Sequence, residues 1–240
     1  SPFMVDSEHL EKIRTVVEVE RQGSRISDSL QEKDPDTLFP LQAALGYSVA
    51  QNLFINKKNL LVEGISDLVY LETMSAELLK RGRTGLSEEA TIVPTGGADK
   101  VATFISLMRG SKLQIVCLLD SFVDKKSKQR IDDLVREKII RDKNIVYYSD
   151  VRNTSYADVE DMFEPEEYLL LYNAAFDKNV SISDIKSDRP IMIQLKDMNG
   201  GAFNHYLPAR EFARRSAEID LSDETLERFE NLFSKLNSLL

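Results

Sequence analysis

The chain has 240 residues, of which 31 are Lys or Arg and 40 are Asp or Glu, so its formal net charge at pH 7 is −9. An acidic protein is not a natural binder of nucleic acid, because phosphate contacts need Lys and Arg. Three interpretations follow: the acids are concentrated in a metal site, most nucleic-acid contacts lie on another part of the protein, or nucleic acid is not the ligand. The single cysteine, Cys117, excludes an intrachain disulfide and suits a reducing cytoplasm. No apolar run approaches the roughly 20 residues of a membrane-spanning helix, so we expect no membrane partner.

The first quarter of the chain predicts a hairpin followed by a connector. Residues 14–27 contain two short runs of weak apolar alternation around Gly23, which predict two strands that end a preceding domain. Residues 28–36 are polar, and residues 37–54 are apolar with helical spacing. We therefore expect the main domain to begin near Lys57.

An acidic residue follows the first strongly apolar run of that domain. Residues 60–62 predict a buried strand, and residues 67–80 predict an amphipathic helix. Glu63 therefore lies at the carboxyl end of a strand, where open α/β sheets place their ligands. Gly64 permits a sharp turn, and Asp67 falls in the first helical turn beside Glu63. Two such carboxylates suit a hard divalent cation, although an acid and a helix cap are also common at an ordinary βα turn.

Two further acidic clusters follow later predicted strands. The apolar run 112–119 leads to the second cluster, and the strand-like segment 144–148 with a turn-rich stretch leads to the third. The acids of these clusters are Asp120, Asp124, Asp158, Glu160 and Asp161. Strands that alternate with helices indicate a parallel sheet, so the three clusters are expected at one edge of it. This pattern favours a metal site over three unrelated turns.

Two other features have both a functional and an ordinary interpretation. The pair Gly96 and Gly97 precedes a predicted helix and can expose backbone amides to a phosphate, but a tight βα turn is the commoner reason for such a pair. The predicted helix 125–141 carries seven Lys or Arg residues and three acids. Because the acids dilute the positive field, a solvated face is favoured there over a DNA-binding track.

After residue 163 the pattern becomes mainly helical. Helices are predicted over 166–176 and 208–217, and from Ser222 to the end of the chain. The apolar segment 190–195 predicts a strand.

The order of these motifs resembles that of a TOPRIM (topoisomerase–primase) domain. The resemblance rests on Glu-Gly-x-Ser-Asp at 63–67, Leu-Leu-Asp at 118–120 and Asp-x-Glu-Asp at 158–161. Among TOPRIM proteins the likeness is greatest to the overcoming-lysogenization-defect (OLD) nucleases, which join an ATP-binding-cassette-type ATPase to a C-terminal TOPRIM domain. The opening Ser-Pro-Phe resembles the sequence after the switch histidine of such ATPases, and residues 36–47 resemble the connector that enters TOPRIM. We therefore expect the chain to be the C-terminal part of a longer protein.

The resemblance implies an α/β fold, with a TOPRIM-like parallel sheet flanked by helices and an additional C-terminal helical region. Residues 1–56 would be the end of an upstream ATPase domain and its connector, 57–163 the catalytic TOPRIM domain, and 164–240 a mostly helical region that completes the site. ATP would bind only through the upstream domain, which would also provide most of a homodimer contact.

The function implied is a divalent-metal-dependent DNA endonuclease with a role in phage defence or DNA repair. Its cofactors would be Mg²⁺ or Mn²⁺, as two ions, with Ca²⁺ as a further ion that can bind. Glu63 and Asp120 would be catalytic as well as metal ligands. The full set of expected ligands is Glu63, Asp67, Asp120, Asp124, Asp158, Glu160 and Asp161.

Two departures from the family pattern keep alternatives open. TOPRIM domains usually carry Asp-x-Asp where this chain has Asp120-Ser-Phe122, and many OLD-like nucleases have a late lysine where this chain reads Phe203 to Arg210. His205 or Arg210 is therefore expected in the lysine's place, as a group that steadies the leaving oxygen. The alternatives are a catalytically degenerate metal-binding or regulatory module and a topoisomerase- or primase-type TOPRIM.

Overall fold

The structure is a computed structural model that describes residues 15–19, 23–27, 57–107, 113–121, 125–186 and 189–240. The chain forms two compact units, residues 1–56 and 57–240. In the first unit, β1 (Thr15–Val19) and β2 (Gly23–Ser27) form the expected antiparallel hairpin. The predicted connector and the helix over 37–54 lie outside the described residues.

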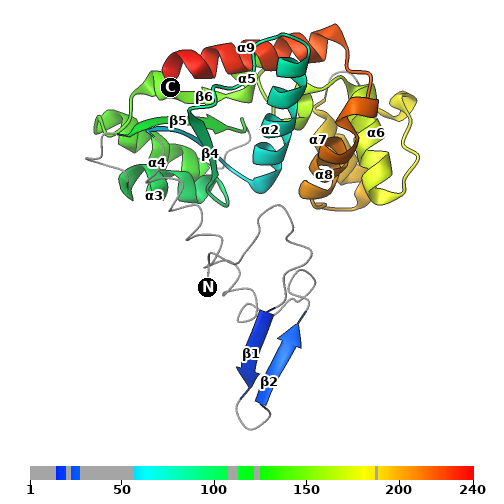
Figure 1. The fold of residues 1–240 in the computed structure, drawn as a ribbon, viewed down its shortest axis with the longest axis horizontal. Coiled ribbons are helices and arrows are strands. Elements are labelled where there is room, and N and C mark those ends of the chain that lie inside the picture. The colour runs from blue at the N-terminus through cyan, green and yellow to red at the C-terminus, as the bar shows by residue number, and fades with distance from the viewer. Residues whose placement is uncertain (1–14, 20–22, 28–56, 108–112, 122–124, 187–188) are drawn as a thin grey trace. The chain divides into compact units, whose positions relative to one another are not determined.

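The second unit contains a parallel four-stranded sheet in the order β4-β3-β5-β6 (Figure 1). The strands are β3 (Lys58–Val62), β4 (Ala90–Pro94), β5 (Gln114–Leu119) and β6 (Ile145–Tyr147). All three pairings in the sheet are parallel. The central strands β3 and β5 are continuous apolar runs because a parallel sheet is covered on both faces. The fold is therefore the α/β, TOPRIM-like sheet that the sequence predicts.

Successive side chains of each strand enter two different layers of core. Leu60 and Val62 belong to a buried cluster that also contains residues of the C-terminal helices, whereas Leu61 between them is buried outside that cluster. The connecting helices are α2 (Ile65–Lys80), α3 (Ala98–Leu107), α4 (Lys125–Arg136) and α5 (Tyr148–Arg152). Helices α3 and α4 lie together on one side of the sheet, and α9 lies on the other (Figure 1).

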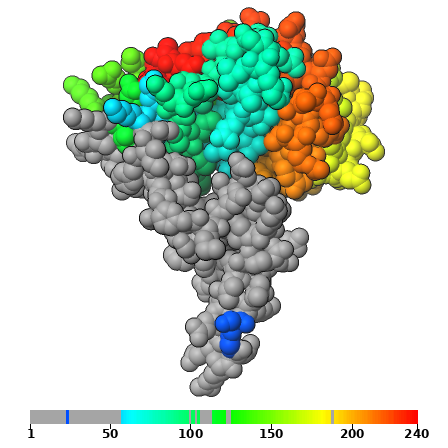
Figure 2. Space-filling view, in the orientation of Figure 1, coloured from blue at the N-terminus to red at the C-terminus, as the bar shows by residue number. Residues whose placement is uncertain are grey.

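The C-terminal helices pack in the same core as the sheet. They are α6 (Pro165–Phe176), α7 (Ile191–Asn199), α8 (Tyr206–Arg215) and α9 (Asp223–Leu239). The ring of Phe163 contacts the rings of Tyr70, Phe212 and Phe229, so it joins α2, α8 and α9. Figure 2 shows α2 and α8 side by side at the surface. Residues 164–240 thus belong to the same compact unit as the sheet.

The strand predicted over 190–195 is wrong, because this segment is the first part of α7. Ile191, Met192 and Leu195 are buried, and their spacing places them on one helical face. Gln194 is also buried, and its side chain hydrogen-bonds to the backbone of Lys186, which satisfies a polar group that a strand would have left facing the core. A short apolar run cannot by itself distinguish a strand from a buried helix.

The helix predicted over 125–141 ends earlier, at Arg136. Lys138 has a φ of 58°, in the left-handed region, and a residue in that conformation ends a helix. In the described part of the chain, no helix combines the length and apolar character needed to cross a bilayer.

Candidate metal centre

Glu63 and Asp67 flank the turn between β3 and α2. Gly64 is the N-cap of α2, and its backbone N–H donates to Oδ2 of Asp67 at 2.9 Å. The hydroxyl of Tyr148 donates to Oδ1 of Asp67, also at 2.9 Å. Asp67 is only 4% exposed, so its carboxylate is held inside the protein by these two donors.

Asp120 lies beside Glu63 because β5 and β3 are neighbours in the sheet. The backbone N–H of Asp120 donates to Oε1 of Glu63 at 3.0 Å. Oδ1 of Asp120 is buried and has no hydrogen-bond partner among the described residues. A buried carboxylate oxygen without a donor is costly unless a cation or another donor satisfies it.

The third acidic cluster is a short segment whose residues hydrogen-bond to one another. The backbone N–H of Asp158 donates to Asp161 Oδ2 at 3.2 Å, and the N–H of Asp161 donates to Asp158 Oδ1 at 3.3 Å. Glu160 is almost fully buried, and its Oε1 lies 3.0 Å from Nδ1 of His205. Since a carboxylate only accepts hydrogen bonds, this contact places the proton on Nδ1 and leaves Nε2 for another partner.

The acids of all three clusters act on one another electrostatically. Burial, followed by the charge of Glu160, raises the pKa of Asp67 to about 6. Burial raises the pKa of Asp120 well above its usual value, and the charges of Asp67 and Glu63 raise it further. The pKa of Asp158 is raised by burial and then by Glu160. A cation among these carboxylates relieves the repulsion and favours their ionised forms.

The carboxylates suit a hard divalent cation as ligands, but the described side chains do not form a complete metal site. The carboxylate oxygens are the type that Mg²⁺ and Ca²⁺ bind, and the unsatisfied oxygen of Asp120 is a place for such an ion. Among the described residues, however, no group of three or more His, Cys, Asp or Glu side chains is close enough to hold a metal together. Asp124 and Phe122 lie outside the described residues. The types of these residues therefore fit a divalent cation, and the positions of the described side chains do not yet form its complete site.

The sequence did not predict one positively charged side chain near this centre, that of Lys196. Lys196 of α7 acts on Asp120 and lowers its pKa, in opposition to the acids. No motif surrounds Lys196, and the strand predicted over 190–195 ended just before it. A helical interpretation of that segment would have been the one available signal. In the described structure the guanidinium of Arg210 contacts Glu211 of its own helix at 3.4 Å, whereas His205 contacts Glu160 at 3.0 Å and Lys196 acts on Asp120.

The glycine turn after β4 supports Glu63. The backbone N–H groups of Gly96 and Gly97 donate to the carbonyl oxygen of Glu63 at 3.0 and 2.8 Å, and the N–H of Thr95 donates to that of Val62 at 2.9 Å. These amides are therefore engaged by the backbone rather than presented to a phosphate. The two glycines have φ values of 84° and 129°, a conformation that other residues rarely adopt. The pair forms the tight turn that was the ordinary interpretation, and it fixes the backbone of a predicted ligand.

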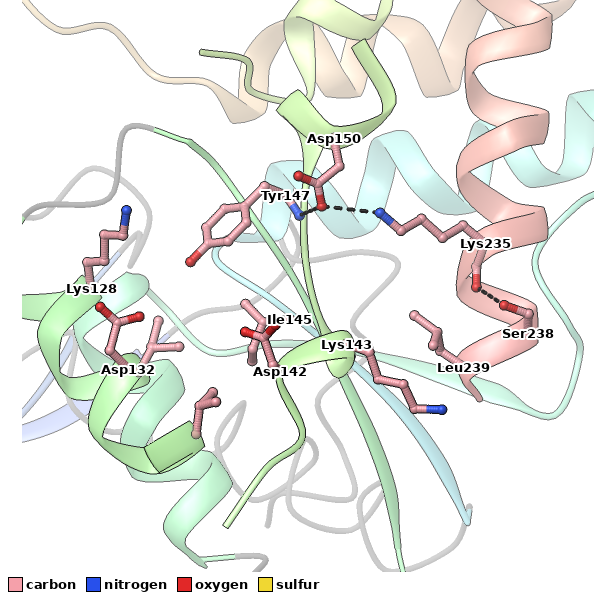
Figure 3. Close-up of a pocket in the computed structure, with 12 residues that line it drawn as sticks. Lys128, Asp132, Asp142, Lys143, Ile145, Tyr147, Asp150, Lys235, Ser238 and Leu239 are labelled. Carbon is pink, nitrogen blue, oxygen red and sulfur yellow. Dashed lines mark hydrogen bonds and ion pairs between the residues drawn. The ribbon is translucent and has the colours of Figure 1, made fainter. Parts of the chain in front are cut away.

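A separate cavity lies at the β6 edge of the sheet (Figure 3). Its volume is about 470 Å³, and its lining comes from α4, β6, α5, α9 and the turn before β6. Asp150 and Lys235 form an ion pair of 3.2 Å in its wall. None of the predicted catalytic or metal-binding residues lines this cavity. The candidate centre is thus the carboxyl edge of the sheet and not this cavity.

Comparison with known proteins agrees with this geometry. Residues 54–121 match the family model described as overcoming lysogenization defect protein-like, TOPRIM domain. The matched segment is less than a third of the chain, but it runs from just before β3 to just after Asp120. The match indicates a nuclease-type metal-binding module, and TOPRIM domains generally bind divalent metals such as Mg²⁺. No curated protein matches the chain.

Proposed function

We propose that this chain, whose residues 54–121 form an OLD-like TOPRIM domain, hydrolyses DNA phosphodiester bonds with the help of divalent metal ions. The observation that carries the proposal is that acids from the segments after β3, β5 and β6 lie near enough to repel one another, although no three of them are close enough to hold a metal in the described structure. In particular, the charges of Asp67, Glu63 and Glu160 all raise the pKa of Asp120, although these residues are widely separated in the sequence. A protein that keeps buried, mutually repelling carboxylates without a cation sacrifices stability, so the arrangement favours a metal-dependent function.

The metal ions, Mg²⁺ or Mn²⁺ and two in number, would be held by carboxylates alone. When bound, they would supply an activated water and stabilise negative charge on the phosphoryl oxygens. Asp124, which lies outside the described residues, is a further candidate. The ligands with described positions are Glu63, Asp67, Asp120, Asp158, Glu160 and Asp161.

Two basic groups would act on the substrate beside these carboxylates. Among the described residues the ammonium of Lys196 forms no ion pair, and its charge acts on Asp120. It would therefore attract a phosphate oxygen and stabilise the charge that develops there. His205 is about one-third exposed, and its contact with Glu160 fixes which ring nitrogen remains available. That nitrogen would steady the leaving oxygen.

The composition of the whole predicted helix favours a solvated face, but the first half of α4 lacks its acids, and we propose that this half contacts the DNA backbone. Lys125, Lys126, Lys128 and Arg130 are all exposed, and the acids of this helix come only later. Because α4 follows β5, it begins at the same edge of the sheet as Asp120. Cations in the first turn oppose the helix dipole, and an anionic partner offsets that cost. Because the net charge is −9, we propose that further phosphate contacts come from an upstream ATPase domain, and the family resemblance suggests that this domain also provides most of a homodimer contact.

The decisive experiment incubates the purified chain with supercoiled plasmid in Mg²⁺, in Mn²⁺ and in EDTA. We expect nicked or linear products in either metal and intact plasmid in EDTA. A ladder of relaxed topoisomers would instead indicate a topoisomerase, and primer synthesis from nucleoside triphosphates a primase. Metal binding by calorimetry without any cleavage would identify a degenerate regulatory module, and cleavage that persists in EDTA would overturn the proposal. We also propose a cytoplasmic location, which the single buried cysteine suits.

A further inference from the structure

Both oxygens of the Asp67 carboxylate are hydrogen-bonded. Gly64 donates its backbone N–H to Oδ2, and Tyr148 donates its hydroxyl to Oδ1, each at 2.9 Å. A carboxylate oxygen accepts about two interactions through its lone pairs, so each oxygen keeps one position for a cation. The first donor belongs to the same turn as Asp67, whereas the second comes from a residue 81 positions later in the chain.

Tyr148 has a fixed hydroxyl group, and its hydrogen bond connects the segment after β6 with the segment after β3. It is the first residue of α5, directly after β6, and its side chain is fully buried in the core cluster that also contains Val146 and Met74. A ring packed on all sides has few alternative rotamers, so its hydroxyl has a fixed position. A phenol is protonated at neutral pH, so the hydroxyl of Tyr148 remains a donor to the Asp67 carboxylate.

We infer that Tyr148 is a positioning residue for the proposed metal centre, because its hydroxyl holds Asp67 in the orientation that turns the remaining lone pairs of the carboxylate toward the cation. The inference rests on the proposed metal-dependent function and adds a residue outside the three acidic clusters. Partners that hydrogen-bond a metal ligand fix its direction, and their loss typically weakens metal binding about 10–100-fold. The ordinary alternative is that the buried hydroxyl simply needs an acceptor and that Asp67 provides one.

The test compares Tyr148→Phe with Tyr172→Phe. Each change removes one phenolic oxygen from a buried tyrosine of the same core cluster. Tyr172 is the matched control because its ring packs against Phe176 and Phe203, and the described structure gives its hydroxyl no bond to a carboxylate. Calorimetry with Mn²⁺ and with Mg²⁺ measures the Kd of each variant at one pH, and urea unfolding in EDTA measures its stability. We expect the Kd of Tyr148→Phe to rise about 10–100-fold and that of Tyr172→Phe to change less than about twofold.

A double-mutant cycle separates positioning from a general effect on the fold. In an Asp67→Asn background the carboxylate that Tyr148 orients is gone, so adding Tyr148→Phe should no longer change the metal Kd. If the same loss persisted there, the hydroxyl would act through the fold and the inference would be overturned. If Tyr148→Phe does not fold, Tyr148→Met provides the same comparison with a flexible apolar side chain.

The remaining outcomes distinguish this inference from the proposed function. Wild-type metal affinity in Tyr148→Phe, with or without reduced stability, means that the hydroxyl has only a structural role, and the nuclease proposal is unaffected. A wild-type chain that binds neither Mn²⁺ nor Mg²⁺ would overturn both.

Discussion

The backbone N–H of Asp120 donates a hydrogen bond to Oε1 of Glu63 at 3.0 Å, which ties the end of β5 to the end of β3. This bond uses the main chain of one predicted ligand to hold the side chain of another. The carboxylate of Asp120 takes no part in this bond, and its Oδ1 has no hydrogen-bond partner among the described residues. We therefore propose that the side chain of Asp120 contributes more to a bound ion than to the fold.

From this we expect Asp120→Asn to separate activity from stability. The variant removes a charge that burial and the neighbouring acids disfavour, so in EDTA at pH 8 it should unfold at a urea concentration no lower than the wild type. Plasmid cleavage should fall roughly 10²-fold or more. Asp150→Asn is the control, because Asp150 pairs with Lys235 away from the candidate centre and its loss should leave cleavage intact. Retained cleavage by purified Asp120→Asn would rule out Asp120 as a ligand.

The raised pKa of Asp67 predicts how stability depends on pH without metal. The folded-state pKa of about 6 lies above the ordinary value of 3.8, so the folded protein binds more protons than the unfolded chain between these pH values. Stability in EDTA should therefore fall as the pH rises from about 4 to about 7, by about 3 kcal/mol in all from this group, and then change no further through it. Urea unfolding at pH 5 and pH 8 measures the part of this loss that occurs above pH 5, which is about half of it.

Asp67→Asn is the control for this pH dependence, because it should remove that part of the difference. Saturating Mg²⁺ should raise the stability of the wild type at pH 8 more than at pH 5. A wild type that gains stability between pH 5 and pH 8 in EDTA would contradict the prediction.

Lys196 should matter for turnover more than for metal binding. Its positive charge acts on Asp120 but an ammonium cannot bind a metal cation, so Lys196→Ala should lower the cleavage rate about 10²-fold while the Mn²⁺ Kd changes little. Lys178→Ala removes an exposed lysine elsewhere and should leave both quantities unchanged. Equal effects of the two changes on cleavage would exclude a specific role for Lys196.

The turn formed by Gly96 and Gly97 should be needed to position Glu63. Gly96→Ala places a side chain at a φ of 84°, and the strain should displace the N–H groups that bind the Glu63 carbonyl. Gly82→Ala is a matched control, since Gly82 also has a positive φ, of 72°, with open space around it, but it lies at the other end of α2. Both changes should lower stability by about 1–2 kcal/mol. Only Gly96→Ala should also weaken metal binding, as calorimetry measures; equal weakening by both would refute the role of the turn.

The parts of this centre that the sequence predicts are those that depend on local pattern. Glu63 and Asp120 each follow an apolar strand run, and the rule that parallel strands end at one edge brings them together. The turn at Gly64 likewise places Asp67 in the first turn of α2. The two-residue glycine turn was predictable as a turn, but not its hydrogen bonds to Glu63, because these depend on which strand β4 pairs with.

The parts that the sequence does not predict depend on packing between distant segments. Tyr148 meets Asp67 across 81 residues, and no local pattern marks that contact. Lys196 reaches the acids only because residues 191–199 are a helix, and the six mostly apolar residues 190–195, of which the first is a proline, are compatible with either a strand or a buried helix. His205 was singled out by its position in the family pattern, whereas its contact with Glu160 follows from how α8 packs in the core.

The first half of α4 should set the salt dependence of DNA binding. The double variant Lys125→Gln/Lys128→Gln removes two exposed cations near the carboxyl edge of the sheet, and each phosphate contact contributes about 0.9 to the slope of log K against log salt concentration. If both lysines contact phosphates, the slope should decrease by about 2 and the affinity should fall similarly for unrelated DNA sequences. Fluorescence anisotropy with a labelled duplex in EDTA measures both. Lys138→Gln/Lys143→Gln makes the same change in net charge beyond the end of α4, so it serves as the control. An identical slope in the two double variants would show that only overall charge matters, and the DNA contact would have to be sought on another surface.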